Sequence, residues 1–121
     1  MDKVYICAPL RSCAEEGMTI ADNIEKAKMY AKYALCECEA APVVSHFFAL
    51  MLDDNIPLER ELGMKAGQEL LIDCDEVWVF GDRMSEGMAD EINFAMSRNI
   101  PVRYFGEQDI NMDEGGTMQY E

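Results

Sequence analysis

A continuous apolar run at residues 76–80 constrains the fold more than any other feature of the chain. The run reads Glu-Val-Trp-Val-Phe and is stopped by Gly81 and Asp82. Because it is rich in β-branched and aromatic residues and shows no polar alternation, it predicts a strand that is covered on both faces. Strands of this kind occur in parallel sheets flanked by helices. The sequence therefore predicts an α/β domain with this strand in the middle of its sheet.

Three shorter segments, at residues 3–8, 42–45 and 101–105, also predict strands, and residues 46–53 predict a loop or a short helix. Amphipathic segments with helical spacing separate the strands. Their apolar faces are predicted to consist of Ile20, Ile24, Ala27, Ala31 and Leu35 in the first, Leu58, Leu62, Ala66 and Leu70 in the second, and Met88, Ile92, Ala95 and Met96 in the third. The order β-α-β-α-β-α-β predicts a three-layer α/β/α arrangement with a mainly parallel sheet of about four to five strands.

The length of the chain limits it to one domain. Its 121 residues, half of them hydrophobic, are enough for one core and too few for two. We expect the α/β domain to occupy residues 1–105. Residues 106–121 are acidic and contain glycine, and we expect this tail to be irregular or to form an oligomer contact.

The formal net charge of −14 excludes several classes of partner. A surface of this charge repels nucleic-acid polymers and anionic membranes, whereas the single phosphate of a mononucleotide needs only a local pocket of donors. No apolar run approaches the roughly 20 residues that cross a bilayer, and the first residues lack the pattern of a secretory signal. We therefore expect a cytoplasmic protein.

The five cysteines are odd in number and are scattered through predicted strands and helices, which favours reduced thiols. Cys36 and Cys38 form the only close pair. With one residue between them and no second ligand pair at suitable spacing, they give little support to a zinc site. We expect neither a bound metal nor a cofactor.

Ligands of open parallel sheets bind beyond the carboxyl ends of the strands, where residues 8–12, 45–46 and 81–88 should meet. Ser85 opens a helix at this edge and is either a simple N-cap or part of an anion site, and the two roles are compatible. Glu91 lies further along that helix, beside Ile92, so its carboxylate should be partly shielded. It either faces water, as most helical glutamates do, or attacks the anomeric carbon of a sugar.

Three other residues near this edge have two interpretations each. Arg11 follows the first strand and could bind a phosphate or a carboxylate. Tyr5 lies within that strand, where a core role with a satisfied hydroxyl is common. His46 is the only histidine and follows the second strand, where a structural hydrogen bond is at least as common as catalysis.

Four segments of the chain carry a resemblance to a known group of enzymes. They are residues 4–11 (Val-Tyr-Ile-Cys-Ala-Pro-Leu-Arg), 42–46 (Pro-Val-Val-Ser-His), 74–80 (Cys-Asp-Glu-Val-Trp-Val-Phe), and the pattern Ser85-x-Gly87-Met88-x-x-Glu91-Ile92-x-x-Ala95. Over residues 4–102 the chain resembles the nucleoside 2-deoxyribosyltransferases and the related 2'-deoxynucleoside 5'-phosphate N-hydrolases. The resemblance implies a flavodoxin-like fold and a homodimer or larger oligomer.

The resemblance also implies roles for individual residues. Glu91 matches the nucleophile and Tyr5 the tyrosine that positions it. Arg11 matches the loop arginine of the nucleotide hydrolases, and Ser85, followed by Gly87 and Met88, stands where those hydrolases carry serine. A neutral hydroxyl accepts a phosphate where a carboxylate would repel it, which favours a nucleoside 5'-monophosphate. We also expect His46 to be one of the substrate-binding residues.

One position departs from the pattern of these enzymes. Their general acid is an aspartate in the helix before the third strand, and the corresponding residue here is Gly67. Gln68 and Glu69 project in other directions, and Asp82 is a possible substitute acid. Two hypotheses follow: an N-glycosidase or deoxyribosyl-transfer enzyme acting on a nucleoside monophosphate, or a nucleotide-binding or sensing domain that has lost catalysis. The same architecture also hosts many unrelated sites.

Overall fold

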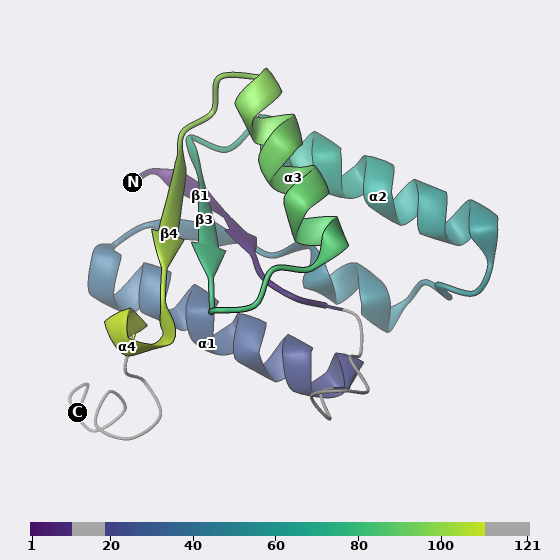
Figure 1. Ribbon diagram of the computed structural model, residues 1–121, viewed down its shortest axis with the longest axis horizontal. Helices are drawn as coiled ribbons and strands as arrows, with labels where there is room; N and C mark the ends of the chain where they lie inside the picture. The colour runs from purple at the N-terminus through teal and green to yellow at the C-terminus, as the bar shows by residue number, and fades with distance from the viewer. Residues whose placement is uncertain (11–18, 111–121) are drawn as a thin grey trace.

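A computed structural model describes residues 1–10 and 19–110 of the chain (Figure 1). Its centre is a four-stranded, fully parallel sheet in the order β2-β1-β3-β4. The strands are β1 (Lys3–Cys7), β2 (Ala41–Val43), β3 (Glu76–Phe80) and β4 (Val102–Phe105). β1 and β3 are each paired on both sides, and all their residues after the first, 4–7 and 77–80, are apolar and buried, as expected of central strands covered on both faces.

Helices cover both faces of this sheet, as the predicted three-layer arrangement requires (Figure 1). α1 (Ile20–Cys38) packs on one face, and α2 (Pro57–Ile72) and α3 (Glu86–Ser97) pack on the other. The 3₁₀ helix η2 (Ser45–Leu50) connects β2 to α2, and the short helix α4 (Glu107–Ile110) follows β4. The predicted α/β/α class and the parallel sheet are confirmed.

The alternation of side chains along the strands divides the core in two. On the α1 side, Phe80 stacks between Tyr30 and Phe105, with ring centroids 4.7 Å and 4.9 Å apart. On the other side, Tyr5 and Val79 pack with residues of α2 and α3. Each face of the sheet therefore packs against its own helices, and a strand side chain can contact only the helices on its side.

The buried face of α1 differs from the predicted one. Ile20 and Leu35 are 38% and 47% exposed, whereas the buried residues are Asn23, Ala27, Tyr30 and Ala34. Thr19 caps the helix, since its hydroxyl accepts from the Asp22 amide at 3.1 Å. The predicted face was wrong because the core side is offset from it by one residue, which is about 100° of rotation: Asn23, Tyr30 and Ala34 each precede a residue of the predicted set.

The predicted faces of the other two main helices are wrong at some positions. In α2 the buried residues are Gly67 and Leu71, while Leu58 and Leu62, predicted to be buried, are 63% and 51% exposed. In α3 the predicted Met88, Ile92 and Ala95 are buried, and Met96 is exposed. The predicted apolar faces of α2 and α3 are therefore corrected at these exposed positions.

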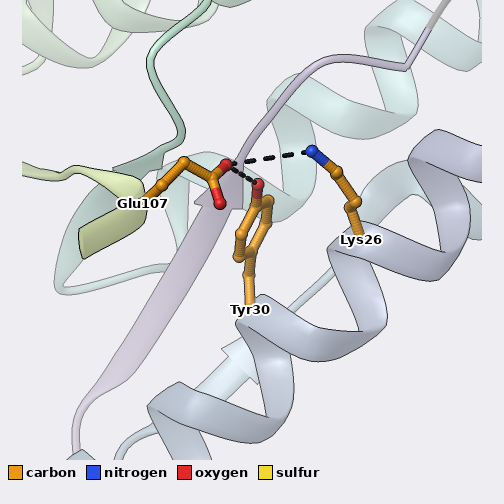
Figure 2. A network of polar contacts seen from close by, with 3 residues as sticks. All are labelled: Lys26, Tyr30 and Glu107. Carbon is orange, nitrogen blue, oxygen red and sulfur yellow. Dashed lines mark hydrogen bonds and ion pairs between the residues drawn. The ribbon is translucent and has the colours of Figure 1, made fainter. Parts of the chain in front are cut away.

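The beginning of the acidic tail is ordered against α1 rather than irregular (Figure 2). The hydroxyl of Tyr30 donates to the carboxylate of Glu107 at 3.0 Å, and the ammonium of Lys26 lies 3.9 Å from the same oxygen. Ile110 is buried in the α1-side core. Residues 107–110 are therefore helical, the expected oligomer contact stays a prediction, and residues 111–121 lie outside the described residues.

Three general properties complete the fold. None of the described helices has both the length and the apolar character needed to cross a membrane. Cys7, Cys36, Cys38 and Cys74 are free thiols, and Cys13 lies outside the described residues. Within residues 1–10 and 19–110, no group of three or more His, Cys, Asp or Glu side chains is arranged to hold a metal ion.

Candidate active site

A hydrogen bond between β1 and α3 forms the centre of the candidate site. Glu91 lies on α3 beside the buried Ile92, and its side chain is directed toward the sheet. Tyr5 is completely buried in β1 on the same side of the sheet. Its hydroxyl donates to Glu91 Oε2 at 2.6 Å, a length typical of a charge-assisted bond. The structure therefore brings the two residues together in one partly shielded location.

Ser45, the first residue of η2, extends this contact. Its Oγ lies 2.7 Å from the hydroxyl oxygen of Tyr5. Because Tyr5 has one hydroxyl proton and donates it to Glu91, Ser45 must be the donor in this second bond. Ser45 was expected at the carboxyl end of a strand, without a role of its own. Its position directly after β2 was the only available signal.

Burial controls the ionisation of the pair. Removal from water raises the pKa of Glu91 above its ordinary value, and hydrogen bonds from Tyr5 and Cys7 act in the opposite direction because they stabilise the carboxylate. Burial, together with the neighbouring charge of Glu91, raises the pKa of Tyr5 well above its ordinary value, so the phenol keeps its proton. The site therefore presents one carboxylate supported by neutral donors.

His46 fixes the end of β1 to η2. It is only 4% exposed, and its Nε2 lies 3.1 Å from the carbonyl oxygen of Ala8 and 3.2 Å from that of Pro9. Carbonyls only accept, so Nε2 carries the proton and Nδ1 is the unprotonated nitrogen. Nδ1 has no hydrogen-bond partner within the described part of the chain. Burial lowers the pKa of the ring, which keeps it neutral.

The first turn of α3 supplies backbone donors at the same edge of the sheet. Ser85 is the N-cap, and its Oγ accepts from the amide of Met88 at 3.2 Å. An added Cβ at Gly87 would meet no atom within 4 Å, so the surface of this turn is open. An open helix N-terminus with a capping hydroxyl suits an anion. Met88 itself is buried and anchors the turn to the core.

Gly67 of α2 faces the phenol from the remaining side. An added Cβ would lie 3.5 Å from the hydroxyl oxygen of Tyr5 and 3.9 Å from Ser45 Cβ. Both distances are ordinary van der Waals contacts. The position therefore has room for a small side chain directed at the Tyr5–Ser45 pair, and the sequence provides none.

Asp82 does not join this cluster in the structure. Asp82 follows Phe80 at the end of β3 and lines a cavity of about 360 Å³ on the α1 side, together with Lys26, Tyr30 and Glu107 among others. The cavity lies on the face opposite Glu91, because Phe80 and Tyr30 belong to the α1-side core. Arg11 lies outside the described residues.

The cluster contains the elements of nucleophilic chemistry at a sugar. A carboxylate that is partly removed from water, oriented by a phenol and a thiol, can attack an electrophilic carbon or stabilise a developing positive charge. The α3 N-terminus at the same sheet edge can hold an anionic group of a bound molecule. No residue of the cluster requires a metal or a cofactor for these roles.

Residues 2–105 match the family described as "Domain of unknown function (DUF7768)", and the chain belongs to that family. None of the curated proteins matches the chain in sequence. Among solved structures, the chain is similar to a 2-deoxyribosyltransferase from the psychrotolerant bacterium Bacillus psychrosaccharolyticus, described as a biocatalyst for the synthesis of antiviral and antitumoral nucleosides. The TM-score is 0.64 at 17% identity, over 86% of this chain and 72% of that chain. The likeness confirms the flavodoxin-like, deoxyribosyltransferase-like fold.

Proposed function

We propose, for this member of a family without an assigned function, that the chain is an N-glycosidase or deoxyribosyl-transfer enzyme that acts on a nucleoside 5'-monophosphate with Glu91 as its nucleophile. The likeness in fold to a 2-deoxyribosyltransferase supports a nucleoside as the class of substrate. The observation that carries the proposal is the 2.6 Å bond between Tyr5 and Glu91. It joins a buried phenol to the one shielded carboxylate of α3 at the edge where this fold binds ligands.

The proposed reaction has two steps. In the first, an oxygen of Glu91 forms a bond to the anomeric carbon while the bond from that carbon to the base nitrogen breaks, and the electron pair leaves with the base. In the second, water or another base attacks the same carbon and releases Glu91. Tyr5 holds the carboxylate in place through both steps. Ser45 keeps the Tyr5 hydroxyl directed at Glu91.

The 5'-phosphate is assigned to the N-terminal turn of α3. There the hydroxyl of Ser85 and the backbone amide of Gly87 are the donors, and Arg11 is proposed to add a positive charge. Met88, whose amide donates to Ser85 Oγ, anchors this turn. The open surface at Gly87 supports this assignment because an anion can approach the backbone there. His46 is proposed to contribute to the substrate-binding wall.

The test is release of free base from a panel of nucleoside and deoxynucleoside 5'-monophosphates, measured by chromatography. Wild type should release base, and Glu91→Gln, which keeps the shape of the side chain, should reduce release to the uncatalysed level. Tyr5→Phe should retain part of the activity. If wild type and Glu91→Gln release base at the same rate from every nucleotide, the enzyme proposal is wrong.

A second candidate function is nucleotide binding without turnover. Gly67 favours it, because the position that faces Tyr5 and Ser45 carries no acid that could protonate a departing base. In that case a monophosphate should raise the melting temperature without being consumed, and Arg11→Ala should abolish the shift. Base release that depends on Glu91 would exclude this alternative.

We also propose that the chain acts in the cytoplasm as a homodimer or larger assembly. Support comes from large apolar side chains that are at least half exposed along η2 and α2, namely Phe47, Leu50, Met51, Leu58, Leu62 and Met64. Exposed apolar clusters of this kind are typical of interaction surfaces. Light scattering of wild type and Leu62→Glu tests this, with the variant expected to be monomeric. A monomeric wild type would refute it.

A further inference from the structure

The missing side chain at Gly67 limits the leaving groups that the proposed site can release. When an ordinary nucleobase departs, the electron pair of the broken bond leaves a negative charge on its nitrogen, and a general acid normally neutralises it. The residue of α2 that faces Tyr5 and Ser45 would be the natural donor, and it is a glycine. The proton for the departing base must therefore come from another group, or the base must leave without needing one.

The described polar groups around Glu91 do not replace such an acid. The proton of the Tyr5 phenol is already donated to Glu91. His46 is neutral, and its one ring proton is directed at the carbonyls of Ala8 and Pro9. Asp82 lies on the opposite face of the sheet, beside Tyr30 and Glu107.

A leaving group that is already cationic needs no acid. If the base is a pyridinium or an N7-alkylated purinium, the electron pair of the broken bond neutralises the ring, and the base departs as a neutral molecule. Such a ring also complements the electrostatics of the site, because Glu91 is a shielded anion held by neutral donors.

We propose that the site acts on nucleoside 5'-monophosphates whose base is a cationic heterocycle. This inference rests on the proposed function, since it uses Glu91 as the nucleophile. A Glu91 oxygen bonds to the anomeric carbon, the carbon–nitrogen bond breaks, and its electron pair cancels the positive charge of the ring. Water then bonds to the anomeric carbon, Glu91 is released as the electron pair of its ester bond returns to it, and the proton of that water passes to solvent.

The first test compares two substrates that differ in one methyl group. Guanosine 5'-monophosphate has a neutral base, and 7-methylguanosine 5'-monophosphate has a cationic one. Nicotinamide mononucleotide provides a cationic ring of a different shape. We expect Glu91-dependent release of 7-methylguanine and of nicotinamide to exceed release of guanine by about 10² to 10⁴-fold, the factor that a general acid ordinarily supplies. Release from Glu91→Gln is subtracted as the background.

The second test restores an acid at the position that lacks one. Gly67→Asp places a carboxyl group toward Tyr5 and Ser45, and the ordinary contact distances there leave room for its Cβ. Gly67→Asn is the matched control, with the same shape and no acid. The preference for the methylated substrate should fall at least tenfold in Gly67→Asp relative to Gly67→Asn. An equal preference in the two variants would contradict the assigned role of this position.

The outcomes separate the two proposals. Glu91-dependent release of guanine within tenfold of 7-methylguanine would overturn the inference and leave the proposed function in place. No Glu91-dependent release from any of the three nucleotides would overturn the inference, and no such release from the panel of nucleoside and deoxynucleoside monophosphates either would overturn both proposals. If either variant at position 67 fails to fold, as judged by circular dichroism, the comparison of substrates in wild type decides alone.

Discussion

Replacing Tyr5 by phenylalanine removes a single hydroxyl group from the centre of the candidate site. The ring is completely buried, so the substitution keeps the packing and deletes the donor to Glu91 at 2.6 Å. A hydrogen bond to a charged group contributes about 1.5–3 kcal/mol. Since one pKa unit corresponds to about 1.4 kcal/mol, Tyr5→Phe should raise the pKa of Glu91 by about one to two units above its wild-type value.

This rise has a defined effect on stability. Burial already places the folded-state pKa of Glu91 above its ordinary value, so the folded protein binds this proton more tightly than the unfolded chain does. Such a group lowers the free energy of unfolding as the pH rises from the unfolded pKa to the folded pKa. In Tyr5→Phe that pH interval is wider. The variant should therefore match wild type most closely in acid and lose about 1.5–3 kcal/mol relative to it above the interval.

Urea denaturation across this pH range measures the effect, because the linear extrapolation gives the free energy of unfolding at each pH. The matched control introduces Tyr5→Phe into Glu91→Gln, where no carboxyl group titrates at this position. The pH-dependent part of the difference should disappear in that background. Parallel pH profiles for wild type and Tyr5→Phe would refute the argument, since they would mean that the phenol does not stabilise the Glu91 carboxylate in solution.

Three further predictions concern stability and are measured by urea or thermal denaturation. Ser45→Ala removes the donor to the phenol oxygen and should lower the free energy of unfolding by about 0.5–1.5 kcal/mol, while an unchanged value would argue against that bond. Leu71→Ala should lower the free energy of unfolding by about 2–5 kcal/mol, and Met96→Ala, at an exposed position that the sequence predicted to be buried, by at most about 0.5 kcal/mol; equal losses would contradict the observed helix faces. Gly81→Ala forces a side chain into a φ of +91° and should lower the free energy of unfolding by about 1–2 kcal/mol. Gly87→Ala lies on open helical surface and should raise it by up to about 1 kcal/mol. Shifts of the same sign would contradict the different backbone conformations of the two glycines.

The sheet was predictable because its strands have a simple pattern. β1 and β3 are paired on both sides and covered on both faces, so nearly every residue in them is apolar. The positions of the helices along the chain were predictable, whereas the side of each helix that faces the core was less so. The leucines at 58 and 62 suggested a face, yet the exposed surface of α2 also carries large apolar residues, and spacing alone does not separate a core face from such a surface.

The candidate site was partly predictable for a related reason. The order of the elements places the ends of β1, β2 and β3 at one edge, and this rule brought Tyr5, His46 and Glu91 into consideration together. It did not predict on which face of the sheet each side chain lies. Asp82 lies on the same side of the sheet as Phe80, two residues earlier, and α1 covers that side. The face becomes known only when the packing of α1 is known.

The same alternation explains why one position of α2 has so much influence on the proposed chemistry. Tyr5 faces the side of the sheet covered by α2 and α3, and Ser45 of η2 also contacts its hydroxyl. α3 contributes Glu91 to this side, and Gly67 is the position of α2 whose Cβ would contact the phenol oxygen. A nucleophile and an acid would thus come from different helices. Among the described residues the first is present and the second is not, so we expect a substitution at position 67 to change the leaving-group preference while Glu91 stays in place on α3.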